Sequence, residues 1–185
     1  MRIITGKHKG RKLFTLEGKN TRPMMDRMKE SIFNIIGPYF DGDIVLDLFG
    51  GSGALSIESI SRGASRAEIV EKHPDAIKII KKNIELVKEE NNINLHSMDY
   101  KIALEHFKNN HMKFDLIFLD PPYRLNIIEE ILEFITLNDL INHYGYIICH
   151  YQKNNHVPKE LNNLKIAKHF SYGSNEVAIY EFIKP

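Results

Sequence analysis

Hydrophobic positions along the chain follow two alternating patterns from residue 43 onward. Short continuous apolar runs, such as residues 44–48, are typical of parallel strands that are covered on both faces. Between these runs, apolar residues recur every three or four positions, as they do on the buried face of a helix. The predicted strands are residues 44–48, 67–71, 94–98, 114–120 and 146–151, and the predicted helices are residues 54–62, 102–107, 127–135 and one that begins at Pro74. Repeated strand–helix units predict an α/β, Rossmann-like, doubly wound sheet with right-handed crossovers.

The two ends of the chain depart from this alternation. Residues 164–170 and 177–183 predict two strands joined at Gly173, which add an antiparallel C-terminal hairpin to a mostly parallel sheet of seven strands. Residues 2–5 and 11–15 flank a basic, glycine-bounded turn and predict an N-terminal β-hairpin, and a helix is expected at about residues 25–39. We expect residues 1–40 to pack as a basic extension on a core domain of residues 41–185, in one folding unit.

The composition favours a single soluble domain. The chain has 185 residues, of which 43% are hydrophobic, enough for one buried core. It lacks the run of roughly 18 apolar residues that a membrane span needs, and its first residues lack a signal peptide's apolar stretch. The single cysteine, Cys149, lies in an apolar run and excludes an internal disulfide or a multi-cysteine metal site. We expect a cytoplasmic monomer without metal or membrane contact.

Charge is distributed unevenly along the chain. Residues 1–29 hold nine Lys and Arg against Glu17 and Asp26, a net charge of +7, so the remaining residues carry −6. A basic segment on an acidic body favours a polyanionic partner, with nucleic acid first, although a solvated lysine-rich surface has the same composition.

A glycine-rich loop, Asp47–Gly53, follows the first predicted strand of the sheet. Ligands bind at the carboxyl ends of such strands, where glycines let the backbone approach closely. A dinucleotide fingerprint would need a third glycine where Ser56 stands, so that interpretation is weak.

Acidic residues at successive strand ends favour an adenosyl-amino-acid ligand instead. Asp47 can bind its ammonium, Glu71 its ribose hydroxyls and Asp99 its adenine amino group, with Lys72 or Tyr100 near the ring. The expected cofactor is S-adenosyl-L-methionine. The expected cofactor-binding residues are Asp47, Phe49, Gly50, Gly51, Gly53, Glu71, Lys72, Asp99 and Tyr100.

The tetrapeptide Asp120-Pro121-Pro122-Tyr123 is the strongest chemical signal. Two prolines fix the backbone at the end of a buried strand, on the same edge as the glycine-rich loop. The Asp120 carboxylate and the Pro121 carbonyl can accept both hydrogens of an exocyclic amine and so direct its lone pair toward a methyl donor. Tyr123 can stack on a base that has been flipped out of its helix. An Asp-Pro turn beside a core tyrosine is the structural alternative.

These motifs together resemble the bacterial RsmD-type methyltransferases over essentially the whole chain. The resemblance is carried by residues 21–34, 45–55, 61–64 and 120–123 and by Tyr172-Gly173. It implies a class I methyltransferase fold and methylation of guanine N2 in 16S ribosomal RNA on the assembled small subunit. Met24-Met25 departs from the Thr-Thr that is frequent in the family.

The resemblance also assigns roles to residues. Asp120, Pro121, Pro122 and Tyr123 would form the catalytic site. RNA contact would fall to the basic residues Arg2, Lys9, Arg11, Lys12, Arg22 and Arg27, although Arg22 or Arg27 could instead face the cofactor carboxylate.

Other functions remain open from the residues alone. An adenine-N6 or protein-glutamine methyltransferase usually has Asn where Asp120 stands, and a DNA enzyme would need a further recognition domain. Asp suits guanine N2 because a carboxylate accepts hydrogen bonds without offering a competing donor. A non-catalytic RNA-binding module would not need the acidic series, and a nicotinamide-dependent oxidoreductase would need an acid/base pair that the sequence does not offer.

Overall fold

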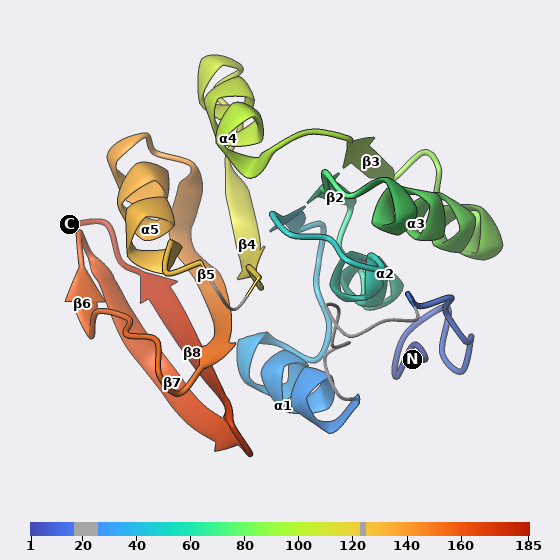
Figure 1. The fold of residues 1–185 in the computed structure, drawn as a ribbon, viewed down its shortest axis with the longest axis horizontal. Helices are drawn as coiled ribbons and strands as arrows, with labels where there is room; N and C mark the ends of the chain where they lie inside the picture. Colours follow the sequence, from blue (N-terminus) through green and yellow to red (C-terminus); the bar gives the residue numbers. More distant parts are fainter. Residues whose placement is uncertain (17–25, 123–124) are drawn as a thin grey trace.

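The structure is a computed structural model that describes residues 1–16, 26–122 and 125–185. Eight strands form one sheet in the order β3-β2-β1-β4-β5-β8-β7-β6, with helices on both faces (Figure 1). The strands are β1 (Ile44–Asp47), β2 (Arg66–Val70), β3 (Ile93–His96), β4 (Phe114–Leu119), β5 (Ile141–Gln152), β6 (Glu160–Leu161), β7 (Leu164–Tyr172) and β8 (Asn175–Phe182). The helices are α1 (Asp26–Ile36), α2 (Ala54–Ser61), α3 (Pro74–Val87), α4 (Tyr100–Asn109) and α5 (Ile128–Leu137). In the described ranges, no helix is long and apolar enough to cross a membrane.

The parallel and antiparallel parts of the sheet meet at β5. Strands β1 to β5 pair in parallel, whereas β8 pairs with β5 in the opposite direction, as does β7 with β8. This confirms the Rossmann-like sheet with a C-terminal hairpin that the sequence predicts. The two-residue strand β6 adds an edge to the seven predicted strands, and β5 begins at Ile141, five residues before its predicted start.

Two apolar layers cover the sheet. One layer packs α1, α2 and α3 against side chains such as Val45, Phe118 and Ile148. The other packs α4 and α5 against the alternate positions, such as Leu46 and Ile117. Because neighbouring residues of a strand point to opposite faces, the continuous apolar runs in the sequence follow directly from this two-sided burial.

The N-terminal segment pairs with itself but forms no extended strand. The amide of Ile3 donates to the Arg11 carbonyl at 2.9 Å and the amide of Leu13 donates to that of Met1 at 2.8 Å, with one antiparallel bridge between Arg2 and Lys12. The predicted β-hairpin is therefore reduced to this single bridge, and the amides of Lys7 and His8 donate to Ser61 of α2 instead. It lies beside α2 and α3, away from the C-terminal hairpin (Figure 1).

A buried ion cluster fixes this segment to two helices. Glu58 on α2 is fully buried and accepts hydrogen bonds from the amides of Ile4 and Thr5. Its carboxylate also contacts Nζ of Lys29 at 3.2 Å and Nε of Arg62 at 2.8 Å. Burial lowers the pKa of Lys29 despite the nearby Glu58 carboxylate. One of the nine basic residues in the +7 segment is therefore an internal ion, unavailable to a polyanion.

Candidate active site

Asp47 closes β1 in a buried position at the carboxyl end of the sheet. Its side chain is 1% exposed, and Oδ2 accepts a hydrogen bond from the Ser56 hydroxyl at 3.3 Å. Oδ1 is buried and has no hydrogen-bond partner. Burial, followed by the negative charges of Asp120 and Glu71, raises the pKa of Asp47 to about 7. A buried carboxylate with an unpartnered oxygen favours a cationic or hydrogen-donating ligand, because such a ligand stabilises its ionised form.

The glycines of the loop after β1 have different physical requirements. A side chain at Gly50 would place its Cβ 2.4 Å from Cγ2 of Ile69, so close packing against β2 requires glycine there. Gly51 has φ 59° and open space at the position of a Cβ, as expected where a ligand lies against backbone. Gly53, with φ 78°, immediately precedes α2, whose first turn has no side-chain cap. Free helix-start amides suit a carboxylate or another anionic group.

Glu71, the first residue after β2, holds this loop in place. Its Oε2 accepts from the Gly51 amide at 3.0 Å, and its Oε1 accepts from the amides of Lys72 and His73 at 2.9 and 2.8 Å. The side chain is partly exposed, so its carboxylate still faces the strand-end edge. Glu71 therefore connects the ends of β1 and β2 in addition to any ligand contact.

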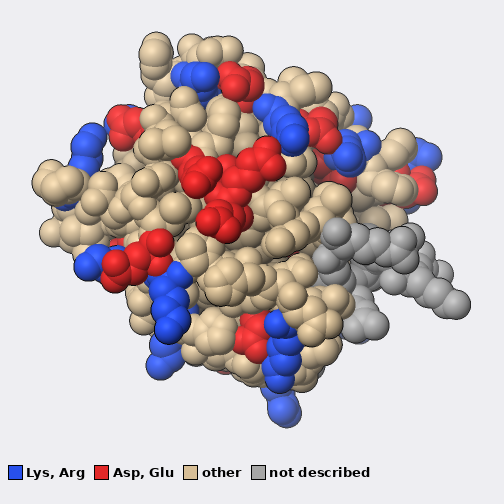
Figure 2. Space-filling view, turned by 60° about the vertical axis from the view of Figure 1, so that its left-hand side comes forward, with Lys and Arg blue, Asp and Glu red and all other residues tan. Residues whose placement is uncertain are grey.

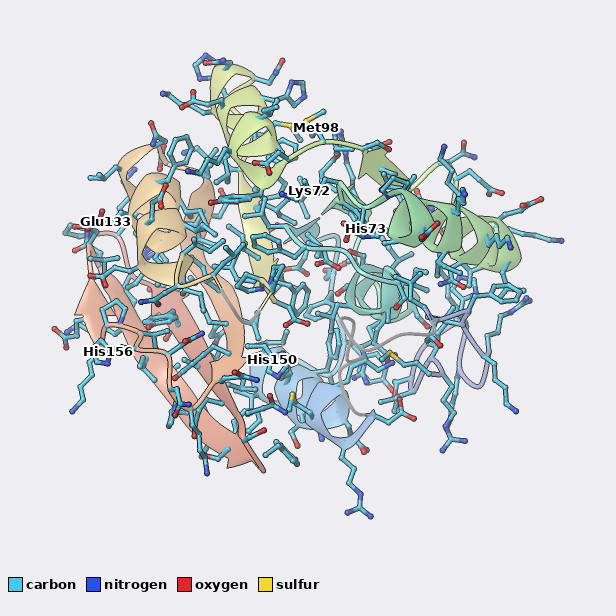
Figure 3. The ribbon with its side chains drawn as sticks, in the orientation of Figure 1. Lys72, His73, Met98, Glu133, His150 and His156 are labelled. Atoms are coloured by element: carbon cyan, nitrogen blue, oxygen red, sulfur yellow. The ribbon has the colours of Figure 1, made fainter. Side chains whose placement is uncertain are left out.

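Asp99 lies at the next strand end and caps α4. Its Oδ1 accepts from the Lys101 amide at 3.0 Å and its Oδ2 from Nζ of Lys72, also at 3.0 Å. The amide hydrogen bond, with the Lys72 charge, lowers the pKa of Asp99. Lys72, which is labelled in Figure 3, is thus paired with Asp99. The rings of Phe49 and Tyr100 lie 5.3 Å apart between centroids, an aromatic pair next to this carboxylate.

Asp120 follows the last residue of β4 and reaches the same edge. Its side chain is 27% exposed, and its charge acts on the buried Asp47 of the neighbouring strand. Pro121 is buried and Pro122 is exposed, and the Pro122 carbonyl accepts from the Leu125 amide at 2.9 Å. Tyr123 lies outside the described residues.

His150 is a site residue that the sequence did not predict. It lies in β5 (Figure 3). Its side chain is 3% exposed, and its Nδ1 is 2.7 Å from Oδ1 of Asp120. The pairing of Leu119 with Cys149 puts Asp120 and His150 at the same level of two adjacent parallel strands. A histidine inside the apolar run of residues 146–151 was the available signal. Its partner depends on strand register, which the sequence alone does not fix.

The predicted cofactor residues therefore gather along one edge, and most of the predicted RNA-binding residues belong to the N-terminal segment, where Arg2 pairs with Lys12. Arg2, Lys9, Arg11, Lys12 and Arg27 are exposed, and Arg22 lies outside the described residues. Two of them make local contacts: Arg2 lies 3.9 Å from the Asp26 carboxylate, and Nη1 of Arg11 donates to the Leu86 carbonyl at 3.0 Å. On the face in Figure 2, acidic atoms gather near the middle and most Lys and Arg atoms lie toward the margin.

The N-terminal segment is linked to the loop after β1 through a side chain on α3. The buried side chain of Asn83 on α3 accepts from the Phe14 amide at 2.8 Å and donates to the carbonyls of Phe14 and Ser52, both at 2.9 Å. A single amide thus joins the basic segment to the glycine-rich loop.

Comparison with known proteins agrees with this arrangement. The family model described as "Conserved hypothetical protein 95" matches residues 1–181. The chain is 37% identical to "Putative rRNA methyltransferase YlbH" of Bacillus subtilis, with 98% of each chain covered. It is 33% identical to "Ribosomal RNA small subunit methyltransferase D" of Haemophilus influenzae, covering 83% of this chain and 79% of that one. A solved structure of a conserved hypothetical protein from Streptococcus pyogenes matches with a TM-score of 0.78 and 41% identity, covering 83% of this chain and 94% of that one. The chain therefore belongs to the conserved hypothetical protein 95 family, the RsmD family of methyltransferases.

Proposed function

We propose that this protein transfers a methyl group from S-adenosyl-L-methionine to the exocyclic N2 amino group of a guanine in 16S ribosomal RNA. The observation that carries the proposal is the partly exposed Asp120 carboxylate at the end of β4, next to the buried Asp47 with its unpartnered oxygen. A relative named as a small-subunit ribosomal RNA methyltransferase, 33% identical, supports ribosomal RNA as the substrate.

The cofactor fits the strand-end edge by the chemistry of its donors and acceptors. The unpartnered Oδ1 of Asp47 suits the cofactor's ammonium, and the uncapped first turn of α2 suits its carboxylate. Glu71 would accept from ribose hydroxyls, and Asp99 from the adenine amino group beside the Phe49 and Tyr100 rings. Since Lys72 now pairs with Asp99, that contact would have to rearrange or share the carboxylate.

Asp120 would act by orientation and charge. A guanine amino group is a poor nucleophile because its lone pair is delocalised into the ring. The Asp120 carboxylate and the Pro121 carbonyl would accept its two hydrogens, turn the lone pair out of conjugation and stabilise the positive charge that develops on nitrogen. The Asp120 carboxylate would then take the proton that the nitrogen loses and release it to water. When bound, S-adenosyl-L-methionine supplies a methyl group on a sulfonium sulfur, which leaves as a neutral thioether.

The target base would have to leave its stack to reach this edge. Extrusion of a base costs a few kcal/mol, which stacking on an aromatic side chain can offset. Tyr123, directly after the two prolines, is the residue we assign to that stacking. Arg2, Lys9, Arg11, Lys12, Arg22 and Arg27 would contact phosphates, and the assembled small subunit is the proposed form of the substrate, bound by a monomer of this chain.

The test is mass mapping of ribosomal RNA from a strain that lacks this protein. We expect one N2-methylguanine to be missing from 16S RNA and to be restored when purified protein and S-adenosyl-L-methionine are added to the deficient subunits. Protein-free 16S RNA, assayed in parallel, identifies the form that is recognised. An unchanged methylguanine pattern, or a lost methyl group on adenine N6 or on a protein glutamine, would overturn the proposal.

A further inference from the structure

The histidine beside Asp120 is held more rigidly than a surface side chain would be. His150 lies in β5, whose neighbours on the two sides are β4 and β8, and it is paired directly with Val177. Its side chain is 3% exposed. A ring that is buried in a close-packed interior, on a strand paired on both sides, has little rotational freedom, so its nitrogens have defined positions relative to the end of β4.

The contact between the two residues has a defined polarity. An ionised carboxylate only accepts hydrogen bonds, so the 2.7 Å distance from Nδ1 of His150 to Oδ1 of Asp120 places the proton on Nδ1. Asp120 itself is partly exposed, and without a partner its two side-chain torsions would be free to rotate. A hydrogen bond from the buried ring fixes Oδ1 and thereby directs Oδ2.

We infer that His150 is a positioning residue for methyl transfer, which holds the Asp120 carboxylate so that Oδ2 meets the substrate's amino group. The inference rests on the proposed function of Asp120. His150 contacts neither the substrate nor the methyl group in this arrangement. It acts through Asp120, because a carboxylate that rotates freely would accept the amino hydrogens in many orientations, of which few direct the lone pair correctly.

Three substitutions separate positioning from packing. His150→Asn places an amide N–H where Nδ1 stands and so keeps the donor to Asp120. His150→Gln places its amide near the position of Nε2 and loses that donor, while retaining a polar side chain of similar length. His150→Leu fills much of the space without any donor. A merely structural histidine would make Asn and Gln equally poor replacements.

A second histidine–carboxylate pair provides the matched control. Nε2 of His96 lies 2.6 Å from Oε2 of the buried Glu68, on β3 and β2. His96→Leu removes a donor from a buried carboxylate, as His150→Leu removes one from Asp120, but outside the proposed site. It should lower the free energy of unfolding without a specific loss of turnover in the protein that remains folded.

The experiment measures S-adenosylhomocysteine affinity by calorimetry, and kcat and KM for methylation of deficient subunits. Loss of a group that orients a functional side chain typically costs about 10- to 100-fold, so kcat should fall by that factor in His150→Leu and His150→Gln. His150→Asn should recover most of the loss. Cofactor affinity and KM should change little in all three variants. With Asp120→Ala already present, His150→Leu should have no further effect, because the two residues act as one unit.

The outcomes distinguish this inference from the proposed function. If wild-type protein methylates the subunits and His150→Leu keeps its kcat, or if Asn and Gln lose activity equally together with cofactor affinity, His150 is not a positioning residue. If wild-type protein transfers no methyl group to a guanine amino group, the proposed function itself is wrong.

Discussion

The carboxylates of Asp47 and Asp120 interact electrostatically at the ends of the adjacent parallel strands β1 and β4. Asp47 is buried and Asp120 is partly exposed, so burial disfavours the ionised form of Asp47 in particular. After burial itself, the charge of Asp120 is the largest contribution that raises the pKa of Asp47. The same edge thus contains an acid that is readily protonated and one that faces outward. A bound cation would stabilise the ionised form of the first.

Asp47 makes the stability of the ligand-free protein depend on pH. Its pKa is about 7 in the folded state, against an ordinary value of 3.8 in the unfolded chain. The folded state therefore holds a proton that the unfolded state loses, and stability falls as the pH rises from about 4 to 7. The upper limit of this loss is about 4 kcal/mol. Asp47→Asn should lack this slope. In urea unfolding at pH 5 and 8, the free energy of unfolding of the variant should therefore show a gain relative to wild type as the pH rises.

A carboxylate with the opposite shift serves as the control. The hydrogen bond from Lys113 lowers the pKa of Asp139, so Asp139→Asn should show no such gain. Asp47→Asn should also weaken S-adenosylhomocysteine binding strongly. An identical pH slope in wild type and Asp47→Asn would show that Asp47 is already ionised in the folded protein.

Asp120→Ala should separate catalysis from cofactor binding. Removal of an acceptor aimed at developing charge costs on the order of 100-fold or more in turnover, so transfer to the subunit should become undetectable or nearly so. Cofactor affinity should stay nearly unchanged or increase slightly, because loss of the Asp120 charge favours the ionised form of Asp47. Calorimetry with S-adenosylhomocysteine and a methyl-transfer assay measure the two effects. A large loss of affinity would place Asp120 in the cofactor site instead.

The sequence predicts the order of elements and the strand-end acids because both depend on local patterns. Asp47, Glu71, Asp99 and Asp120 each follow or close an apolar run, and parallel strands bring their carboxyl ends to one edge. His150 depends instead on the register between β4 and β5, to which strands far apart in sequence contribute. Register reflects packing of the whole sheet, which periodicity does not encode.

Two further features depended on tertiary contacts. Lys29 belongs by sequence to the basic segment, yet the structure buries it against Glu58. The N-terminal hairpin has strand-like residues, but its hydrogen bonds to α2 and α3 limit its own pairing to one bridge. In both cases the local sequence pattern identifies the type of residue or strand correctly but does not predict which residues it contacts. Charge counts alone therefore overestimated the basic surface available to RNA.

The buried ion cluster should be a strong contributor to stability. Lys29→Met leaves Glu58 buried with one fewer positive partner, and breaking a buried pair in this way costs about 3–5 kcal/mol. Arg62 and two backbone amides still contact the carboxylate, so we expect the lower end of that range. Lys101→Met removes a comparable charge from the exposed pair with Glu130 and should cost less than about 1 kcal/mol. Urea unfolding at neutral pH measures both, and equal losses would contradict a special role for the buried cluster.

The exposed residues Arg11 and Lys12 test whether the N-terminal segment contacts RNA. Each phosphate contact that is lost lowers the salt dependence of binding, so Arg11→Ser with Lys12→Ser should reduce the slope of log affinity against log salt by about 2. Lys165→Ser with Lys168→Ser removes the same charge from β7, on the other side of the molecule (Figure 1). That control should leave the slope nearly unchanged, which separates a local contact from a general loss of positive charge. Titration of deficient subunits over a range of salt concentrations measures both variants. Equal slopes in the two variants would mean that the segment serves to pack against α2 and α3, where Asn83 already joins it to the loop after β1.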